Sequence, residues 1–265
     1  MEGAAAPWLA AALAVAAWWG ATGALMWRVA RADAAGIDAH RRSVALGTPL
    51  LAAGIAGVIL SRDAVGPGGA CAAFLSAMAV WGWIELAFLS GIVTGPNRAA
   101  AVPGRGRFGR ALGTVAHHEA ALVTGLAGVA AAWWGGAQWL APATYAVLLA
   151  ARTSAKVNLY LGVPRFTAQF LPSPLAHLPS HFGAARLNRF FPVSVTVLTG
   201  AALMLGERAA GAAGPGAQAA LALMATLTAL AALEHWLMVL PVRDDGLWRW
   251  ATGGEANKAG ETHGI

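Results

Sequence analysis

Long apolar segments dominate this sequence and limit what the chain can fold into. A helix needs about 20 mostly apolar residues to cross the ~30 Å hydrocarbon core of a bilayer. Seven segments meet or approach this length, at residues 7–27, 43–60, 70–94, 111–134, 142–161, 190–205 and 217–242. Charged residues make up only 11% of the chain, against about 25% in a soluble domain. The sequence therefore predicts an all-α integral membrane protein, a single seven-transmembrane-helix bundle over residues 1–250.

The basic residues predict which end of this bundle faces the cytoplasm. Sixteen of the 18 Lys and Arg residues fall in the first, third and fifth connections, at the end of the fifth segment or after the last segment, and only Arg62 and Arg208 fall on the other side. Because Lys and Arg stay on the cytoplasmic side of a membrane, we expect a periplasmic N-terminus and a cytoplasmic C-terminus in a bacterial inner membrane. These charges sit where lipid head groups lie, so the net charge of +6 does not indicate a nucleic-acid partner.

Two further segments are distinct from the predicted spans. Residues 163–189 are apolar but contain four prolines, which prevent a continuous helix. We expect this segment to lie along the cytoplasmic membrane surface or to cap the helix ends, either packed on its own bundle or as a platform for a partner. Residues 251–265 are expected to form a flexible cytoplasmic tail. The single cysteine, Cys71, excludes an intrachain disulfide.

Ionisable residues within the predicted spans are the candidates for function, because charged groups at membrane depth are costly. They are Glu85, His117, His118, Glu119, Glu234 and His235. At 1.5 Å per residue, Glu85, His118 and His235 each lie roughly 12–14 Å from the cytoplasmic end of their span. The sequence therefore predicts one polar layer shared by three helices, with Lys156 and Asn158 on the fifth span as secondary candidates.

Several chemical roles are open to such a layer. A metal site is one, although residues 117–119 point about 100° apart around a helix and cannot all converge. A tetrapyrrole contact is another, with one His as the axial ligand of magnesium or iron. An interhelical hydrogen-bond network is the role that physical reasoning alone favours. A retinal protein is excluded, because the seventh span holds no lysine for a Schiff base.

Several stretches together resemble a known family. They are Trp81–Pro96, His117–Glu119, Lys156–Pro164, Phe191–Thr196 and Leu233–Trp250. In combination they resemble the photosynthetic complex assembly protein 2 family, the PuhE type, of anoxygenic phototrophic bacteria. The resemblance implies a membrane protein that helps to assemble the reaction centre and light-harvesting complex by modulating bacteriochlorophyll supply or delivery. It implies no catalytic activity and no set of functional residues, and segment 166–170 lacks the acidic residues that are common in the family.

We therefore expect a non-enzymatic assembly factor whose polar layer binds bacteriochlorophyll or a precursor. The expected partners are photosynthetic complex subunits or pigment-synthesis proteins, together with membrane lipids. The residues predicted to bind the cofactor are Glu85, His117, His118, Glu119, Glu234, His235, Asn158 and Lys156. The alternative is a membrane-embedded, metal-dependent enzyme that acts on a tetrapyrrole or an isoprenoid lipid, with the metal in the same layer.

Overall fold

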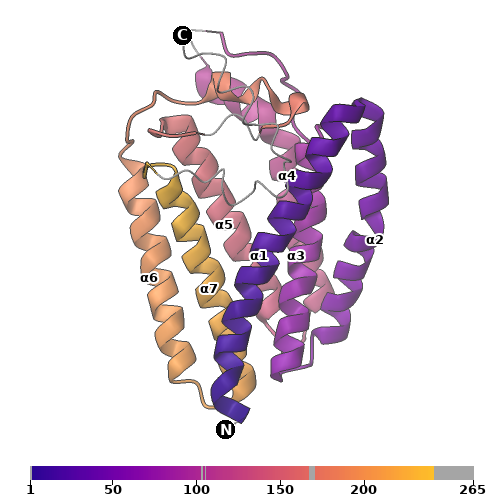
Figure 1. Cartoon of the computed structure of the whole chain (residues 1–265), viewed down its shortest axis with the longest axis vertical. Helices are drawn as coiled ribbons and strands as arrows, with labels where there is room; N and C mark the ends of the chain where they lie inside the picture. The colour runs from indigo at the N-terminus through magenta and orange to yellow at the C-terminus, as the bar shows by residue number, and fades with distance from the viewer. Residues whose placement is uncertain (1, 103, 105, 167–170, 242–265) are drawn as a thin grey trace.

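The computed structural model of the chain is a bundle of long helices that run up and down side by side (Figure 1). It describes residues 2–102, 104, 106–166 and 171–241, so the predicted tail at 251–265 lies outside the described residues. The helices are α1 (Glu2–Ala35), α2 (Ile37–Ser61), α3 (Pro67–Leu89), α4 (Arg107–Trp133), α5 (Leu140–Leu161), α6 (Phe190–Ala210) and α7 (Pro215–Leu237), with 3-10 turns η2 (Ser173–Leu175) and η3 (Leu178–His181). No strand occurs in the described ranges, which confirms the predicted all-α class.

Five helices, α1, α2, α3, α6 and α7, are long and apolar enough to cross a membrane. The helices α4 and α5 are also long, at 27 and 22 residues, but they are less apolar. Arg110, His118 and Glu119 lie within α4, and Arg152 and Lys156 lie within α5. The structure therefore supports a multi-pass membrane protein, while the count of seven spans stays a prediction.

The third predicted span ended at Thr94, but α3 ends at Leu89 because the chain turns there. Gly91 adopts a φ of +71°, the left-handed conformation that glycine favours. The Gly91 N–H donates to Phe88 O at 2.8 Å, and the Ile92 N–H donates to Ala87 O at 2.9 Å. These two bonds are the Schellman pattern that satisfies the last carbonyls of a helix.

Three other helices also end five or more residues away from the predicted end of their span. The helix α1 continues to Ala35, eight residues past the predicted 27, because no Gly or Pro lies between residue 27 and Gly36, whose φ is +88°. The helix α6 continues to Ala210 rather than residue 205. The helix α7 ends at Leu237, ahead of residue 242, where the Met238 N–H bonds to His235 O at 3.1 Å and tightens the last turn.

The centre of the bundle is formed by α3 and α7. Half or more of the apolar window of each is buried, against 17% for α1, α2 and α6. Small side chains allow the helices to approach closely: a Cβ at Gly54 on α2 would lie 2.8 Å from the Val80 side chain on α3.

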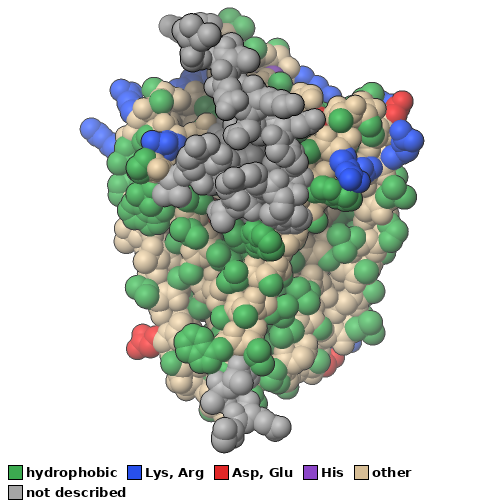
Figure 2. All heavy atoms as spheres, viewed as in Figure 1, with side chains coloured by type: hydrophobic (Ala, Val, Ile, Leu, Met, Phe, Trp, Pro, Cys, Tyr) green, Lys and Arg blue, Asp and Glu red, His purple; other side chains and the backbone are tan. Residues whose placement is uncertain are grey.

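Positive charge is concentrated at one end of the bundle. Figure 2 shows the Lys and Arg side chains gathered toward the end where the connections α1–α2 and α5–α6 lie. The other end, which holds the start of α1, shows acidic side chains in this view. The bundle is therefore electrically asymmetric along its long axis.

Candidate functional site

Three helices bring a charged group together in the interior of the bundle. Glu85 on α3 is 6% exposed, and its Oε2 accepts a 2.8 Å hydrogen bond from Arg152 Nη2 on α5. The other carboxylate oxygen, Oε1, lies 3.6 Å from Nε2 of His118 on α4. His118 is fully buried. We call these three residues the Glu85 cluster.

A second ion pair lies beside the Glu85 cluster. Lys156 Nζ on α5 donates to Glu119 Oε1 on α4, and both side chains are mostly shielded. Arg152 and Lys156 are four residues apart, which places them on the same face of α5. Two carboxylates therefore face two fixed cations, so the charges of the two pairs balance.

The ring of Phe88 packs against this charged region. It stacks on the His118 ring with centroids 4.0 Å apart and planes 23° apart. The Arg152 guanidinium and the Lys156 ammonium lie 6.0 and 5.7 Å from its centroid. These distances permit a cation–π attraction in addition to the ion pairs.

The opposite face of α5 carries a separate hydrogen-bond network. Ser154 Oγ lies 2.9 Å from His235 Nε2 on α7, and Asn158 Nδ2 donates to Ser194 Oγ on α6 at 2.9 Å. Asn188 donates to Asn158 Oδ1 at 3.1 Å. The helix α5 therefore joins two polar groups, the ion pairs toward α3 and α4 and the neutral network toward α6 and α7.

Two of the predicted site residues lie apart from both groups. His117 is exposed on the outer surface of α4, because it points about 100° away from His118. Glu234 is also exposed, and its Oε1 accepts a 2.7 Å hydrogen bond from Trp18 Nε1 on α1. The six other predicted residues belong to the two groups, and their assignment as cofactor ligands stays a prediction.

We define residues 171–182 as the capping loop. It covers the Glu85 cluster on the side that faces the basic end of the bundle. Leu175 and Leu178 are buried and pack on Phe88. The loop also bonds to the chain between α3 and α4, where His181 Nε2 lies 3.0 Å from Ala99 O. Of the two expectations for segment 163–189, the described part of the segment therefore fits a cap packed on its own bundle.

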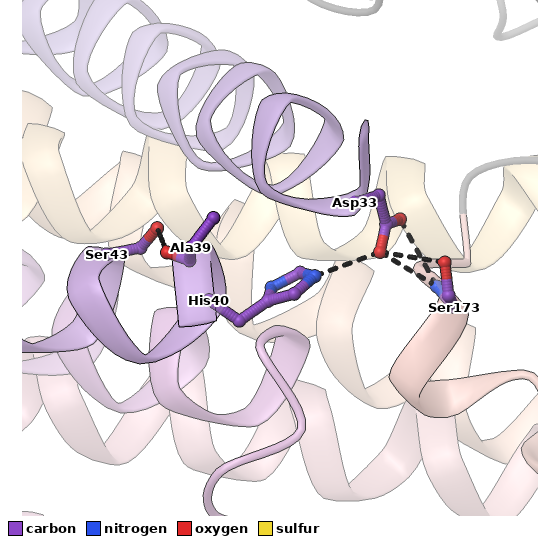
Figure 3. Close-up of polar contacts among 5 residues, drawn as sticks. All are labelled: Asp33, Ala39, His40, Ser43 and Ser173. Carbon is purple, nitrogen blue, oxygen red and sulfur yellow. Dashed lines mark hydrogen bonds and ion pairs between the residues drawn. The ribbon is translucent and has the colours of Figure 1, made fainter. Parts of the chain in front are cut away.

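The capping loop is held to α1 and α2 by one carboxylate (Figure 3). Asp33, near the end of α1, accepts hydrogen bonds from Ser173 Oγ at 2.9 Å and from the Ser173 N–H at 3.2 Å. Its Oδ1 also lies 3.0 Å from Nε2 of the buried His40 on α2. Serine and histidine both bond to the aspartate here, so the arrangement is a tether and not the serine–histidine relay of a hydrolase.

One titratable group of the capping loop has a shifted acidity. Burial lowers the pKa of the His177 imidazole below its ordinary value, and the charges of His181 and Arg98 act in the same direction. The loop is therefore packed most favourably when His177 is neutral.

The described residues offer few places for a cofactor. They contain no group of three His, Cys, Asp or Glu side chains that could hold a metal ion. Both ring nitrogens of His235 are within hydrogen-bond distance of protein oxygens, and His118 is enclosed by Phe88 and Glu85. Of the three histidines in α4 and α7, His117 alone is exposed. Chemically, the Glu85 cluster is a buried, charge-balanced pair beside an imidazole that can donate and accept hydrogen bonds.

Sequence reasoning missed several members of these groups. Arg152 was counted only among the basic residues that set orientation, although its spacing from Lys156 is the i, i+4 spacing of a shared helix face. Ser154 gave no signal, because a serine in a membrane helix commonly bonds its own backbone. Asp33 and His40 were missed because they lie at the α1–α2 turn, outside the predicted spans.

Comparisons with known proteins give two matches. The sequence profile of a family described as "Protein of unknown function (DUF3623)" matches residues 4–259. A protein of Rhodobacter capsulatus named "Uncharacterized 30.4 kDa protein in puhA 5'region" is 51% identical over 247 residues, which is 92% of this chain and 90% of the relative. No solved structure matches the chain.

Proposed function

The chain belongs to the DUF3623 family, and on that premise we propose that it is a non-enzymatic assembly factor for photosynthetic complexes in a bacterial inner membrane. The observation that carries the proposal is the name of the 51% identical relative, which locates that protein in the 5' region of puhA. The proposal also agrees with the resemblance to the photosynthetic complex assembly protein 2 family.

We further propose that all seven helices cross the membrane with the N-terminus in the periplasm. The charge asymmetry of the bundle supports this orientation, because its basic end would then face the cytoplasm. The ion pairs support membrane spans for α4 and α5, since Glu119 and Lys156 lie on these two helices and neutralise one another within the bundle.

The geometry of the interior fits a binding or docking protein better than an enzyme. Each fixed cation of the two ion pairs has a carboxylate partner, so the charges stabilise the bundle itself. The capping loop packs on Phe88 and so covers the side of the Glu85 cluster that faces the basic end of the bundle. A pigment such as bacteriochlorophyll or a precursor would reach His117 on the outer face of α4 more easily than the buried histidines.

Gene deletion in an anoxygenic phototroph tests the proposal. We expect membranes of the deletion strain to contain less assembled reaction centre and light-harvesting complex, measured by near-infrared absorption and by subunit immunoblots. A plasmid copy of the wild-type gene is the positive control and should restore both signals. Normal levels of pigmented complex in the deletion strain would contradict the proposal.

The alternative, a metal-dependent membrane enzyme, is separated by elemental analysis of the purified protein. A stoichiometric transition metal would favour the enzyme. Bacteriochlorophyll that copurifies with the wild-type protein and is lost in a His117→Leu variant would favour a pigment contact at that residue. A Thr124→Leu variant, which places a leucine at another exposed position on the same face of α4, is the matched control.

A further inference from the structure

Buried polar atoms without a hydrogen-bonding partner are concentrated around His118. Among the described residues, six of the ten such atoms are both ring nitrogens of His118, Glu85 Oε1, Arg152 Nε and the hydroxyls of Ser90 and Thr94. Leaving a buried polar atom unbonded is unfavourable, because the atom loses its hydrogen bonds to water and gains none in return. Because these atoms belong to the junction of α3, α4 and α5, a ligand that bonds to several of them at once would stabilise the bundle.

The geometry places three of these atoms near one another, and Thr94 lies next to them along the backbone. The 3.6 Å separation of Glu85 Oε1 and His118 Nε2 is too long for a direct hydrogen bond. Arg152 Nε belongs to the guanidinium group that bonds the other oxygen of Glu85. Thr94 lies beside His118, because its carbonyl accepts the His118 backbone N–H at 2.9 Å.

The unbonded atoms define the chemistry of the ligand. A neutral imidazole offers one donor and one acceptor, a carboxylate only accepts, and the Arg152 Nε–H only donates. The ligand must therefore both donate and accept hydrogen bonds. It must also be uncharged, since the carboxylates of Glu85 and Glu119 already balance the two cations of α5.

We propose that Glu85, His118 and Thr94 hold ordered water inside the bundle, in a site that Phe88 and the capping loop separate from the cytoplasm. Water is the small neutral ligand that makes two to four hydrogen bonds of both kinds in polar protein interiors.

His235 provides an internal control for a test of this site. It is 1% exposed and His118 is 0% exposed, so bulk solvent is excluded equally from both rings. The ring nitrogens of His235 lie 2.8 and 2.9 Å from Ala231 O and Ser154 Oγ. The two histidines thus differ in whether their ring nitrogens already have protein atoms as hydrogen-bonding partners.

Solid-state NMR of histidine-15N-labelled protein in lipid nanodiscs makes the comparison. The His118 signal is assigned by its loss in a His118→Gln variant. Polarisation transferred from water protons should reach the His118 ring several-fold faster than the His235 ring. Equal slow transfer to both rings would overturn the proposal, and so would a His118 signal typical of a direct bond to Glu85.

A Thr94→Val variant tests the contribution of the hydroxyl group. We expect water transfer to His118 to slow several-fold in this variant and to recover in Thr94→Ser, which keeps the hydroxyl. Thr228→Val is the matched control, because the hydroxyl of this buried threonine already bonds Met224 O at 2.7 Å within its own helix. Unchanged transfer in Thr94→Val, with the His235 signal in place, would contradict the assignment of Thr94 to the site.

Discussion

Replacing Glu85 with glutamine removes the negative partner of Arg152 and preserves the size of the side chain. The 2.8 Å contact between Arg152 Nη2 and Glu85 Oε2 places the charge centres roughly 4 Å apart, where the attraction is about 4 kcal/mol at an effective dielectric constant near 20. The Arg152 side chain is 37% exposed, so part of this attraction is screened. We expect Glu85→Gln to lower the free energy of unfolding by about 2–3 kcal/mol.

Removing the cation of the pair instead of the carboxylate should lower the free energy of unfolding by less. In Arg152→Gln the remaining carboxyl group can take up a proton and become neutral, whereas the guanidinium left by Glu85→Gln cannot lose one. We therefore expect a loss of about 1–2 kcal/mol for Arg152→Gln. The double variant should be no less stable than Glu85→Gln alone, because neither charge is then left without its partner.

Reversible unfolding in mixed micelles, followed by tryptophan fluorescence, measures these differences. The exposed Glu207 on α6 offers a matched control, and Glu207→Gln should change stability by less than about 0.5 kcal/mol. Strictly additive losses in the double variant, or an unchanged midpoint for Glu85→Gln, would refute the view that this pair stabilises the bundle.

Three further predictions concern the capping loop and the end of α3. Asp33→Asn removes the charge that tethers the loop, so limited proteolysis of the loop should become several-fold faster while helical circular dichroism is retained. Gly91→Ala adds a Cβ 2.4 Å from a proline of the loop at a φ of +71°, which should lower stability by about 1–3 kcal/mol; Gly82→Ala, in open space, should not. Because the pKa of His177 is lowered by burial, the folded loop binds fewer protons than the unfolded loop. Its stability should therefore fall as pH drops below about 6.5, measured as faster proteolysis at pH 5.5 than at 7.5, and the difference should shrink in His177→Gln.

The sequence indicated the level of the polar groups but not their partners. Counting residues from span ends predicted that Glu85 and His118 share one depth, and the structure places them 3.6 Å apart. The sequence does not show which of His117 and His118 faces the interior, because the rotation of a helix about its axis depends on how it packs against its neighbours. The same holds for Glu234 and His235, of which only the second is buried.

Helix ends were predicted well where a strong breaker follows an apolar run, and less well elsewhere. Leu161 was placed correctly as the end of α5, since Gly162 follows it with a φ of +116°. The end of α3 was placed at Thr94 because Gly95-Pro96 is the more conspicuous signal. The turn at Gly91 lies against Pro174, a residue 83 positions later in the chain, and local sequence patterns do not report such a contact.

The pairing of α4 with α5 bears on how the chain is inserted during synthesis. A central Asp, Lys or Arg opposes transfer of a single helix from the translocon to lipid by roughly 2.5–3.5 kcal/mol. The helix α4 carries the carboxylate Glu119 near its middle, and α5, which is made after it, carries Arg152 and Lys156. Joined as a hairpin, they present the neutral Glu119–Lys156 pair instead. We therefore expect α4 to remain at the translocon until α5 has emerged, and the two to partition together. In ribosome-arrested chains that end before α5, α4 should crosslink to the translocon, whereas in longer chains it should crosslink to lipid.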